Sequence, residues 1–136
     1  LQRHELFIYC GHGGGEQYLP ASRLRALESC ASSILMGCSS GKLTTGAAFG
    51  AAYDATGTAL SYLMAGAPAV VGNLWDVTDK DIDRYCTALL NAMMESARAR
   101  GGATLGTLVQ RCRLSCRLTY LIGASPVVYG LPVRFS

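Results

Sequence analysis

Long hydrophobic runs, Cys-x-x-Cys pairs and clusters of basic residues are all absent from this chain. Glycine, proline and aspartate interrupt the longest apolar stretches well before the roughly 18 residues that a membrane span needs, so neither a span nor a signal peptide is predicted. Six cysteines without a Cys-x-x-Cys pair predict neither a disulfide framework nor a zinc site, which favours a reducing compartment, the cytoplasm or the nucleus. The 12 basic residues are scattered among 9 acidic ones, and this pattern does not favour direct binding of nucleic acid.

The composition fits one globular domain. Half of the 136 residues are hydrophobic, 15% are charged and the net charge is +3. This is enough apolar material for a core, in a chain too short for two domains. The first residue is leucine rather than methionine and a strand follows almost at once, so we expect residues 1–136 to be part of a larger protein.

A short apolar run ends at a cysteine in residues 33–41 (SILMGCSSG). Ile34 to Met36 predict a buried strand, and Gly37 lets the backbone turn and places Cys38 where that strand ends. Open α/β sheets carry their chemistry at the carboxyl ends of their strands. A lone cysteine more often packs as a small hydrophobe, so the case for a nucleophile depends on what lies beside it.

Only two histidines occur in the chain, and one of them also follows a predicted strand. Residues 5–10 (ELFIYC) are rich in β-branched and aromatic side chains and stop at residues 11–15 (GHGGG). This strand brings His12 to the edge of the sheet. The glycines around His12 leave room for a substrate carbonyl close to peptide N–H groups, whereas His4 lies in a polar stretch and is expected at the surface.

Two kinds of hydrolytic enzyme fit these loops. Residues 12–15 (HGGG) match a lipase-type oxyanion loop, and residues 37–41 (GCSSG) satisfy the G-x-S-x-G pattern with Ser39 as nucleophile. The triad of an α/β-hydrolase runs in the order serine, acid, histidine, and no histidine follows residue 12. A pair on neighbouring strand ends, with Cys38 as nucleophile and His12 as its base, fits this order better.

The rest of the chain predicts a βαβ unit and an edge strand. Residues 42–57 are expected to form a loop at the rim of the groove, residues 58–66 a helix, and residues 69–74 a second buried strand. This succession favours a parallel sheet. Residues 126–133 contain two prolines and predict an edge strand that closes the sheet.

Two further helices are predicted in the second half of the chain. Thr78 and Asp81 predict a capping box for a helix that runs to about Arg100. Its apolar stripe is expected to form core: Ile82, Cys86, Leu89, Leu90, Met93 and Ala97. A second helix is predicted over residues 105–116, with a solvated basic face made of Arg111, Arg113 and Arg117.

Four stretches of the chain form a specific pattern when they are taken together. In chain order they are residues 9–18 (YCGHGGGEQY), 35–41 (LMGCSSG), 71–83 (VGNLWDVTDKDID) and 125–130 (SPVVYG). The pattern resembles the separases, caspase-like cysteine endopeptidases that open cohesin. Bacterial CHAT-domain proteases share the histidine, the cysteine and a Leu-Trp strand end, but the strings GEQY and WDVTDKD favour the separases.

The resemblance implies an α/β, caspase-like fold, a mostly parallel sheet with helices on both faces. The first strands of that fold are missing from this chain, so residues 1–136 are expected to be the C-terminal part of the protease domain. The implied nucleophile is the Cys38 thiolate, and His12 acts as acid and base. The peptide N–H groups of Gly13 and Cys38 form the implied oxyanion hole, and no cofactor is needed.

Cleavage after arginine is a further implication of the resemblance. The loop after the strand at residues 69–74 must leave the sheet at the edge that carries Cys38 and His12, so its carboxylates are the nearest acids. Asp79, in the first turn of the helix, is the first candidate for the arginine pocket, and Asp76 is the second.

The resemblance also implies partners. The implied substrate is the kleisin subunit of cohesin, cut to release sister chromatids in anaphase, and a securin-type inhibitory chaperone is the implied partner. Neither nucleic acid nor a membrane is expected as a direct partner. A different class of function stays open, a scaffold with the same fold and no turnover, although the presence of both His12 and Cys38 weighs against it.

Overall fold

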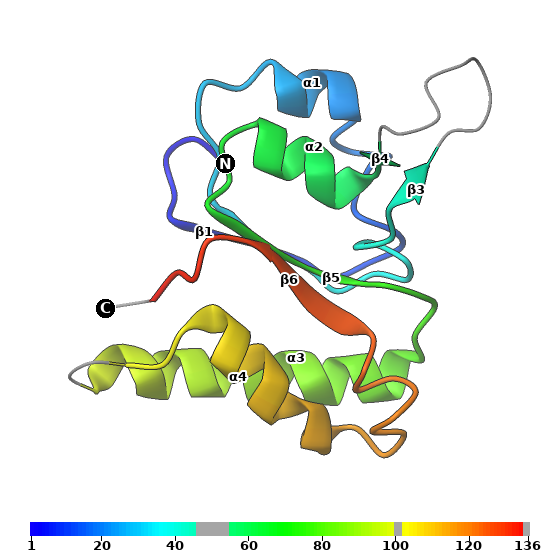
Figure 1. Cartoon of the computed structure of the whole chain (residues 1–136), viewed down its shortest axis with the longest axis vertical. Coiled ribbons are helices and arrows are strands. Elements are labelled where there is room, and N and C mark those ends of the chain that lie inside the picture. The colour runs from blue at the N-terminus through cyan, green and yellow to red at the C-terminus, as the bar shows by residue number, and fades with distance from the viewer. Residues whose placement is uncertain (46–54, 100–101, 135–136) are drawn as a thin grey trace.

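Four strands form the sheet on which the chain is built. The structure is a computed structural model that describes residues 1–45, 55–99 and 102–134. The strand order is β1 (Leu6–Tyr9), β2 (Ser32–Leu35), β5 (Ala69–Asn73) and β6 (Pro126–Gly130) (Figure 1). The strands β1, β2 and β5 are parallel, whereas β6 runs antiparallel to β5 at the edge. The predictions of a mostly parallel sheet and of a closing edge strand are confirmed.

Helices cover both faces of this sheet, as the α/β prediction requires. On one face lie α1 (Ala21–Arg25) and α2 (Thr58–Met64), and on the other lie α3 (Asp79–Arg98), α4 (Leu105–Cys112) and the 3₁₀ helix η1 (Arg113–Ser115) (Figure 1). Every residue of β2 and β5 is buried. A strand covered on both faces needs a continuous run of apolar or small residues rather than an alternating one. Both sequences show this pattern, apart from Asn73 at the end of β5.

Alternate residues of the two buried strands pack into two separate cores. Leu35 and Val70 pack with the side chains of α1 and α2, whereas Ile34 and Val71 pack with those of α3 and α4. This division follows from the two-residue period of a strand. Because both faces are packed, the ends of β2 and β5 are held firmly at the edge where the chain leaves the sheet.

The helix α3 buries one face against the sheet. Most of the predicted stripe is buried, namely Ile82, Cys86, Leu89 and Met93. Leu90 is half-buried and Ala97 is exposed, so the stripe is narrower than predicted. The buried face of α3 also includes Tyr85, which was not part of the predicted stripe. Tyr85 is fully buried and donates a hydrogen bond of 3.0 Å to the carbonyl oxygen of Val109 in α4. Burial raises the pKa of Tyr85, which therefore remains a donor.

The predicted capping box at Thr78 and Asp81 is wrong. Thr78 is the N-cap residue of α3, but its side chain makes no capping hydrogen bond. The Asp81 carboxylate turns inward and accepts hydrogen bonds from the peptide N–H groups of Arg117 at 3.1 Å and Leu118 at 3.0 Å. The guanidinium of Arg84 adds a contact of 2.7 Å. A buried carboxylate is stabilised by several donors at once, and the segment after η1 supplies more of them than the start of α3.

We expect Asp81→Ala to lower the thermal unfolding midpoint of the protein by several degrees, because the substitution leaves two peptide N–H groups without an acceptor. The bond from Leu118 is the main cause of the lowered pKa of Asp81. The stabilisation by Asp81 is therefore complete above the pKa of this carboxyl in the unfolded chain, about 3.9. It is lost as the pH falls through the lower pKa that Asp81 has in the folded protein. Thermal melts at a series of pH values measure both effects. Asp83→Ala, at an exposed position of the same helix, is the control, and equal midpoints for the two variants would contradict this role.

The last helix is shorter than predicted. The helix α4 ends at Cys112, η1 follows, and Cys116 lies beyond both. Arg111 and Arg117 are exposed as predicted, but Arg113 is half-buried and donates to a carbonyl oxygen of β6 at 3.4 Å. The basic face is thus made of two arginines instead of three.

The segment predicted as a loop at residues 42–57 holds a small ribbon at its ends. The strands β3 (Thr44–Thr45) and β4 (Ala55–Thr56) pair in antiparallel fashion, and residues 46–54 of that prediction lie outside the described residues.

Within the described ranges, no helix is both long and apolar enough to cross a membrane. All six cysteines, which belong to the described part of the chain, are free thiols.

Candidate active site

A pocket opens at the edge of the sheet where three parallel strands end. Because β1, β2 and β5 run in the same direction, the residues that follow them leave the sheet on one side. The pocket has a volume of about 400 Å³, and its walls come from the loop after β1, the turn after β2 and the first turns of α3. Three predicted site residues line it together: His12, Cys38 and Asp79.

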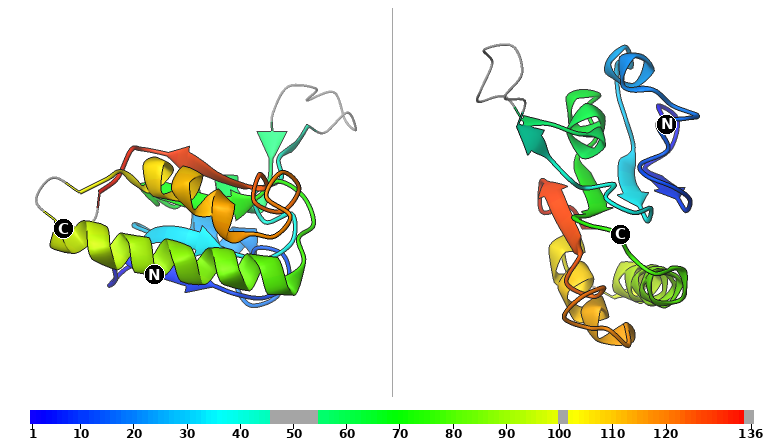
Figure 2. Two further views of the ribbon diagram at one scale, coloured as in Figure 1. Left: turned by 90° about the horizontal axis from the view of Figure 1, so that it is seen from below. Right: turned by 90° about the vertical axis from the view of Figure 1, so that its right-hand side faces the viewer.

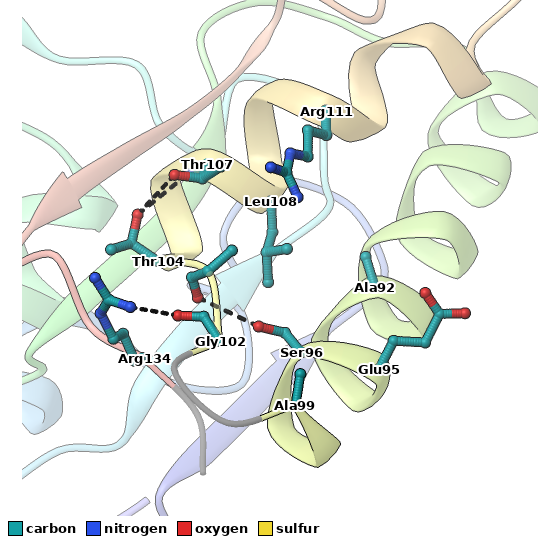
Figure 3. A pocket seen from close by; sticks show the side chains of 11 residues that line it. Ala92, Glu95, Ser96, Ala99, Gly102, Thr104, Thr107, Leu108, Arg111 and Arg134 are labelled. Carbon is teal, nitrogen blue, oxygen red and sulfur yellow. Dashed lines mark hydrogen bonds between the residues drawn. The ribbon is translucent and has the colours of Figure 1, made fainter.

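A larger pocket, of about 700 Å³, lies near the other end of α3 (Figure 3). Its lining includes Ser96, Thr104 and Arg111. About 25 Å of helix separates Ser96 from Asp79 at the 1.5 Å rise of an α-helix. No cysteine or histidine is among the described residues that line this pocket. It offers no thiol–imidazole pair, so the smaller pocket is the candidate site.

Buried polar groups hold the turn that carries Cys38. The Asn73 side-chain amide, at the end of β5, donates to the carbonyl oxygen of Gly37 at 3.1 Å. The Ser40 hydroxyl donates to the carbonyl oxygen of Leu35 at 2.7 Å and accepts from the Asn73 peptide N–H at 3.0 Å. Asn73 and Ser40 are almost fully buried. Neither residue was predicted to support the site. For Asn73 there was a signal in the sequence, a polar residue at the end of an otherwise apolar strand.

The thiol of Cys38 is half-buried and lies against the peptide of Val77. The Val77 N–H donates to Sγ, and the Val77 carbonyl oxygen accepts from the thiol, both at 3.4 Å. Val77 lies two residues before the start of α3. The turn after β2 and the loop before α3 therefore fix the sulfur from two sides, while its remaining side faces the pocket.

The His12 loop is held by its own neighbours. The Tyr9 hydroxyl donates to the carbonyl oxygen of His12 at 3.0 Å. Gly13 has a φ of +61°, a conformation that suits glycine. The Glu16 carboxylate accepts from the Gly14 peptide N–H at 3.0 Å and from the Thr58 hydroxyl, which ties the loop to α2. The His12 side chain itself is exposed at the pocket.

Gly37 lets the His12 loop approach the Cys38 turn. A Cβ atom at this position would collide with the carbonyl oxygens of Gly11 and Gly13 and would lie 2.7 Å from the Gly13 nitrogen. These are backbone atoms of the His12 loop, which have little room to move. The spacing between imidazole and thiol thus depends on the absence of a side chain at residue 37.

We expect Gly37→Ala to lower the activity of the site by up to about 10²-fold, since a displacement of about 1 Å at a reacting group can cost this much. The strand β2 ends before residue 37, so the sheet itself should remain intact. Hydrolysis rates and circular dichroism of the purified protein measure the two effects. Gly106→Ala, at an open position in α4, is the matched control. Full activity of Gly37→Ala would show that the two loops need not be in contact.

The predicted acidic residues separate into two groups. Asp79 lines the pocket, and so does Asp83, which lies one turn further along α3. Asp76 is not among the lining residues, and its carboxylate accepts a hydrogen bond of 2.7 Å from the Ser39 hydroxyl. Ser39 has a φ of +53°, a conformation that this bond helps to stabilise. From the sequence, Asp83 is one of the acids near this edge, but it is passed over as a pocket residue because it lies a turn into the helix; its i, i+4 spacing from Asp79 is the signal for a shared helix face.

Two peptide N–H groups in the site are available for a ligand. Within the described residues, no hydrogen bond is donated by the N–H of Gly13 or by that of Cys38. Cys38 lines the pocket, whereas Gly13 is not among the described residues that line it and lies against Gly37. In the described part of the chain, no cluster of three or more histidine, cysteine or acidic residues is arranged to hold a metal ion.

Comparison with known proteins gives consistent results over nearly the whole chain. The family model "Separin, protease domain" matches residues 1–82. The separin of Schizosaccharomyces pombe is 46% identical over 135 residues, which is 97% of this chain and 7% of that protein. The separin of Mus musculus is 44% identical over 136 residues, which is 100% of this chain and 6% of that protein.

Solved structures show the same relationship. A crystal structure of the Saccharomyces cerevisiae separase–securin complex superposes with a TM-score of 0.83 at 43% identity, over 96% of this chain and 9% of the matched chain. A second crystal structure of that complex gives a TM-score of 0.82 at 42% identity. The chain spans less than a tenth of the length of each of these relatives. On the match to its family model and on these identities, the chain belongs to the separin protease domain family.

Proposed function

We propose that the chain is the C-terminal part of a separase-type protease domain and that Cys38 is its nucleophile. The single observation that carries this proposal is the pocket that His12, Cys38 and Asp79 line together. A thiol beside an imidazole at a strand end is an arrangement that suits acyl transfer. Membership of the separin protease family supports peptide hydrolysis as the reaction.

The proposed reaction uses four groups of this chain. The Cys38 thiolate attacks the scissile carbonyl carbon, and the oxyanion that forms accepts hydrogen bonds from the N–H groups of Gly13 and Cys38. His12 protonates the leaving amine, and later takes a proton from the water that hydrolyses the thioester. Acid–base catalysis of this kind contributes about 10²–10⁴-fold, and each oxyanion donor contributes about 10²–10³-fold. These contributions are sufficient for peptide hydrolysis without a cofactor.

The proposed specificity is for arginine before the scissile bond. Asp79 lines the pocket from the first turn of α3, and Asp83 adds a second negative charge one turn further on. A guanidinium between these carboxylates would form charge-assisted hydrogen bonds. Asp76 remains the second candidate, because its bond to Ser39 engages only one of its two carboxylate oxygens.

The proposed biological role follows from the family rather than from the pocket. We propose the kleisin subunit of cohesin as substrate, with cleavage in anaphase, and the cytoplasm and nucleus as the location. The solved relative is a complex with securin, which supports a securin-type inhibitory chaperone as partner. Nucleic acid and membranes have no direct part in this proposal.

Cleavage of a matched peptide pair by the full-length protein tests the proposal. One peptide carries arginine before a single scissile bond, and the other carries citrulline, which has nearly the same shape but no charge. We expect cleavage after arginine and at least about tenfold slower cleavage after citrulline, as the loss of one charged hydrogen bond predicts. Failure of the folded protein to cut either peptide or the intact kleisin would instead favour a scaffold without turnover.

A further inference from the structure

Two cysteines outside the proposed catalytic pair lie near each other at the pocket: Cys10 lines it, and Cys86 is buried in the core under α3. Along β1, Phe7 and Tyr9 pack with the core under α1 and α2, whereas Leu6 packs with the core under α3 and α4. Cys10 follows the last residue of β1 and lines the pocket together with Ile82 and Asp83 of α3, so it lies on the α3 side of the sheet. Cys10 is exposed and lines the pocket together with Cys38.

The helix α3 carries the second thiol. Ile82 of α3 lines the same pocket as Cys10, and Cys86, which is not itself a lining residue, lies four residues later on the same helix face. Cys86 is buried in the core that also contains Ile82. The helix α3 lies below the part of the sheet formed by β1 and β2 (Figure 2). Burial, followed by interaction with the neighbouring Cys10 thiol, raises the pKa of Cys86 to about 12.

We propose that Cys10 and Cys86 are an oxidation site in which a peroxide converts the two thiols into an intramolecular disulfide. Cys10 reacts first because it is exposed, whereas Cys86 is buried. Its sulfur attacks one peroxide oxygen, the O–O bond breaks, and the products are a Cys10 sulfenic acid and one water. The sulfur of Cys86 then attacks the sulfenic sulfur, the S–O bond breaks, and the hydroxyl leaves as a second water with the Cys86 proton. Two thiols are thereby oxidised and one hydrogen peroxide is reduced to two waters.

The disulfide would connect two walls of the pocket. Cys10 lies two residues before His12, and Cys86 lies one turn beyond Asp83 on α3. A disulfide holds its two Cα atoms within about 4.4–6.8 Å, so the link would fix the His12 loop relative to the helix that carries Asp79. Formation of the disulfide does not depend on peptidase activity, whereas its effect on cleavage rests on the proposed function.

Peptide mapping of the full-length Cys38→Ser protein tests this proposal, because the substitution removes the competing thiol from the pocket. The protein is treated with hydrogen peroxide, alkylated with N-ethylmaleimide and digested with trypsin without reduction. Cys10 and Cys86 are then the only cysteines in residues 4–23 and 85–98. We expect these two peptides to be joined, with the loss of two hydrogens, as the main oxidised product. Cys10 sulfinic acid beside a fully alkylated Cys86, or Cys10 joined to another cysteine, would overturn the proposal.

Two variants serve as controls in the same Cys38→Ser background. Cys112→Ala removes a buried cysteine from α4 and should leave the joined peptides unchanged. Cys10→Ser changes an exposed residue and should keep Cys86 in the thiol form after peroxide treatment; oxidation of Cys86 in this variant would contradict the order of steps. Joined peptides from a wild-type protein that cleaves no substrate would support the oxidation site and count only against the proposed function.

Discussion

Replacing Cys38 with serine is expected to lower peptide cleavage by at least about 10⁴-fold, the scale on which removal of a catalytic nucleophile acts. A serine hydroxyl is a much weaker nucleophile than a thiolate at neutral pH. The fold should survive, because Cys38 is only half-buried and a hydroxyl can keep the two contacts with Val77. His12→Ala should lower cleavage to a similar extent, because it removes the proposed acid and base. It should also leave the fold intact, since the His12 side chain is exposed and contributes little burial. Hydrolysis rates and thermal melts of the full-length protein measure the two effects.

Ser39→Ala is the matched control for this prediction. It alters the next residue and removes the hydrogen bond to Asp76, but it leaves the thiol in place. We expect it to retain activity within about tenfold of wild type, as loss of one side-chain hydrogen bond predicts. A Ser39→Ala protein without activity, together with an active Cys38→Ala protein, would favour the α/β-hydrolase alternative.

The second large effect is expected at Asp79. If its carboxylate pairs with the substrate guanidinium, Asp79→Ala should lower kcat/KM for arginine substrates at least about a hundredfold, equivalent to about 2.7 kcal/mol. Loss of one partner of a buried charged pair costs about 2–5 kcal/mol. A carboxylate that only complements the dipole of α3 would contribute about 0.3–1 kcal/mol, so the magnitude distinguishes the two roles.

Two controls make the Asp79 prediction specific. Labelling of Cys38 by a small uncharged thiol reagent should persist in Asp79→Ala, because the reagent needs no arginine pocket. Asp76→Ala should lose less activity than Asp79→Ala, since Asp76 bonds to Ser39 and does not line the pocket. Near wild-type cleavage by Asp79→Ala with a large loss in Asp76→Ala would assign the arginine pocket to Asp76.

The central strands and the architecture were predictable from the sequence because burial on both faces leaves a plain signal. The run at Ile34 to Met36 is apolar throughout, the run at residues 69–74 is apolar apart from Asn73, and the sheet places both between helices. The meeting of His12 with Cys38 in one pocket also follows from local sequence. Each residue comes directly after a strand, and parallel neighbours end at the same edge.

Long-range polar contacts were not predictable in this way. Asp81 has the spacing of a capping residue, but its partners are peptide N–H groups 36 and 37 residues further along the chain. Asn73 holds the carbonyl oxygen of Gly37, 36 residues earlier in the sequence. Side-chain hydrogen bonds of this kind depend on which segments the fold brings together, whereas hydrophobic periodicity reports only which face of an element is buried. The proposed pairing of Cys10 with Cys86 likewise depends on which segments the fold brings together.

Covalent labelling of the full-length protein with a peptidyl acyloxymethyl ketone that carries arginine tests the central claim most directly. Trypsin releases Cys38 together with Cys30 in residues 26–42, and fragment spectra of this peptide locate the label. We expect one thioether on Cys38, formed in the wild-type protein and lost in His12→Ala. A label on Ser39 or Cys30, or a folded wild-type protein that takes no label, would contradict it.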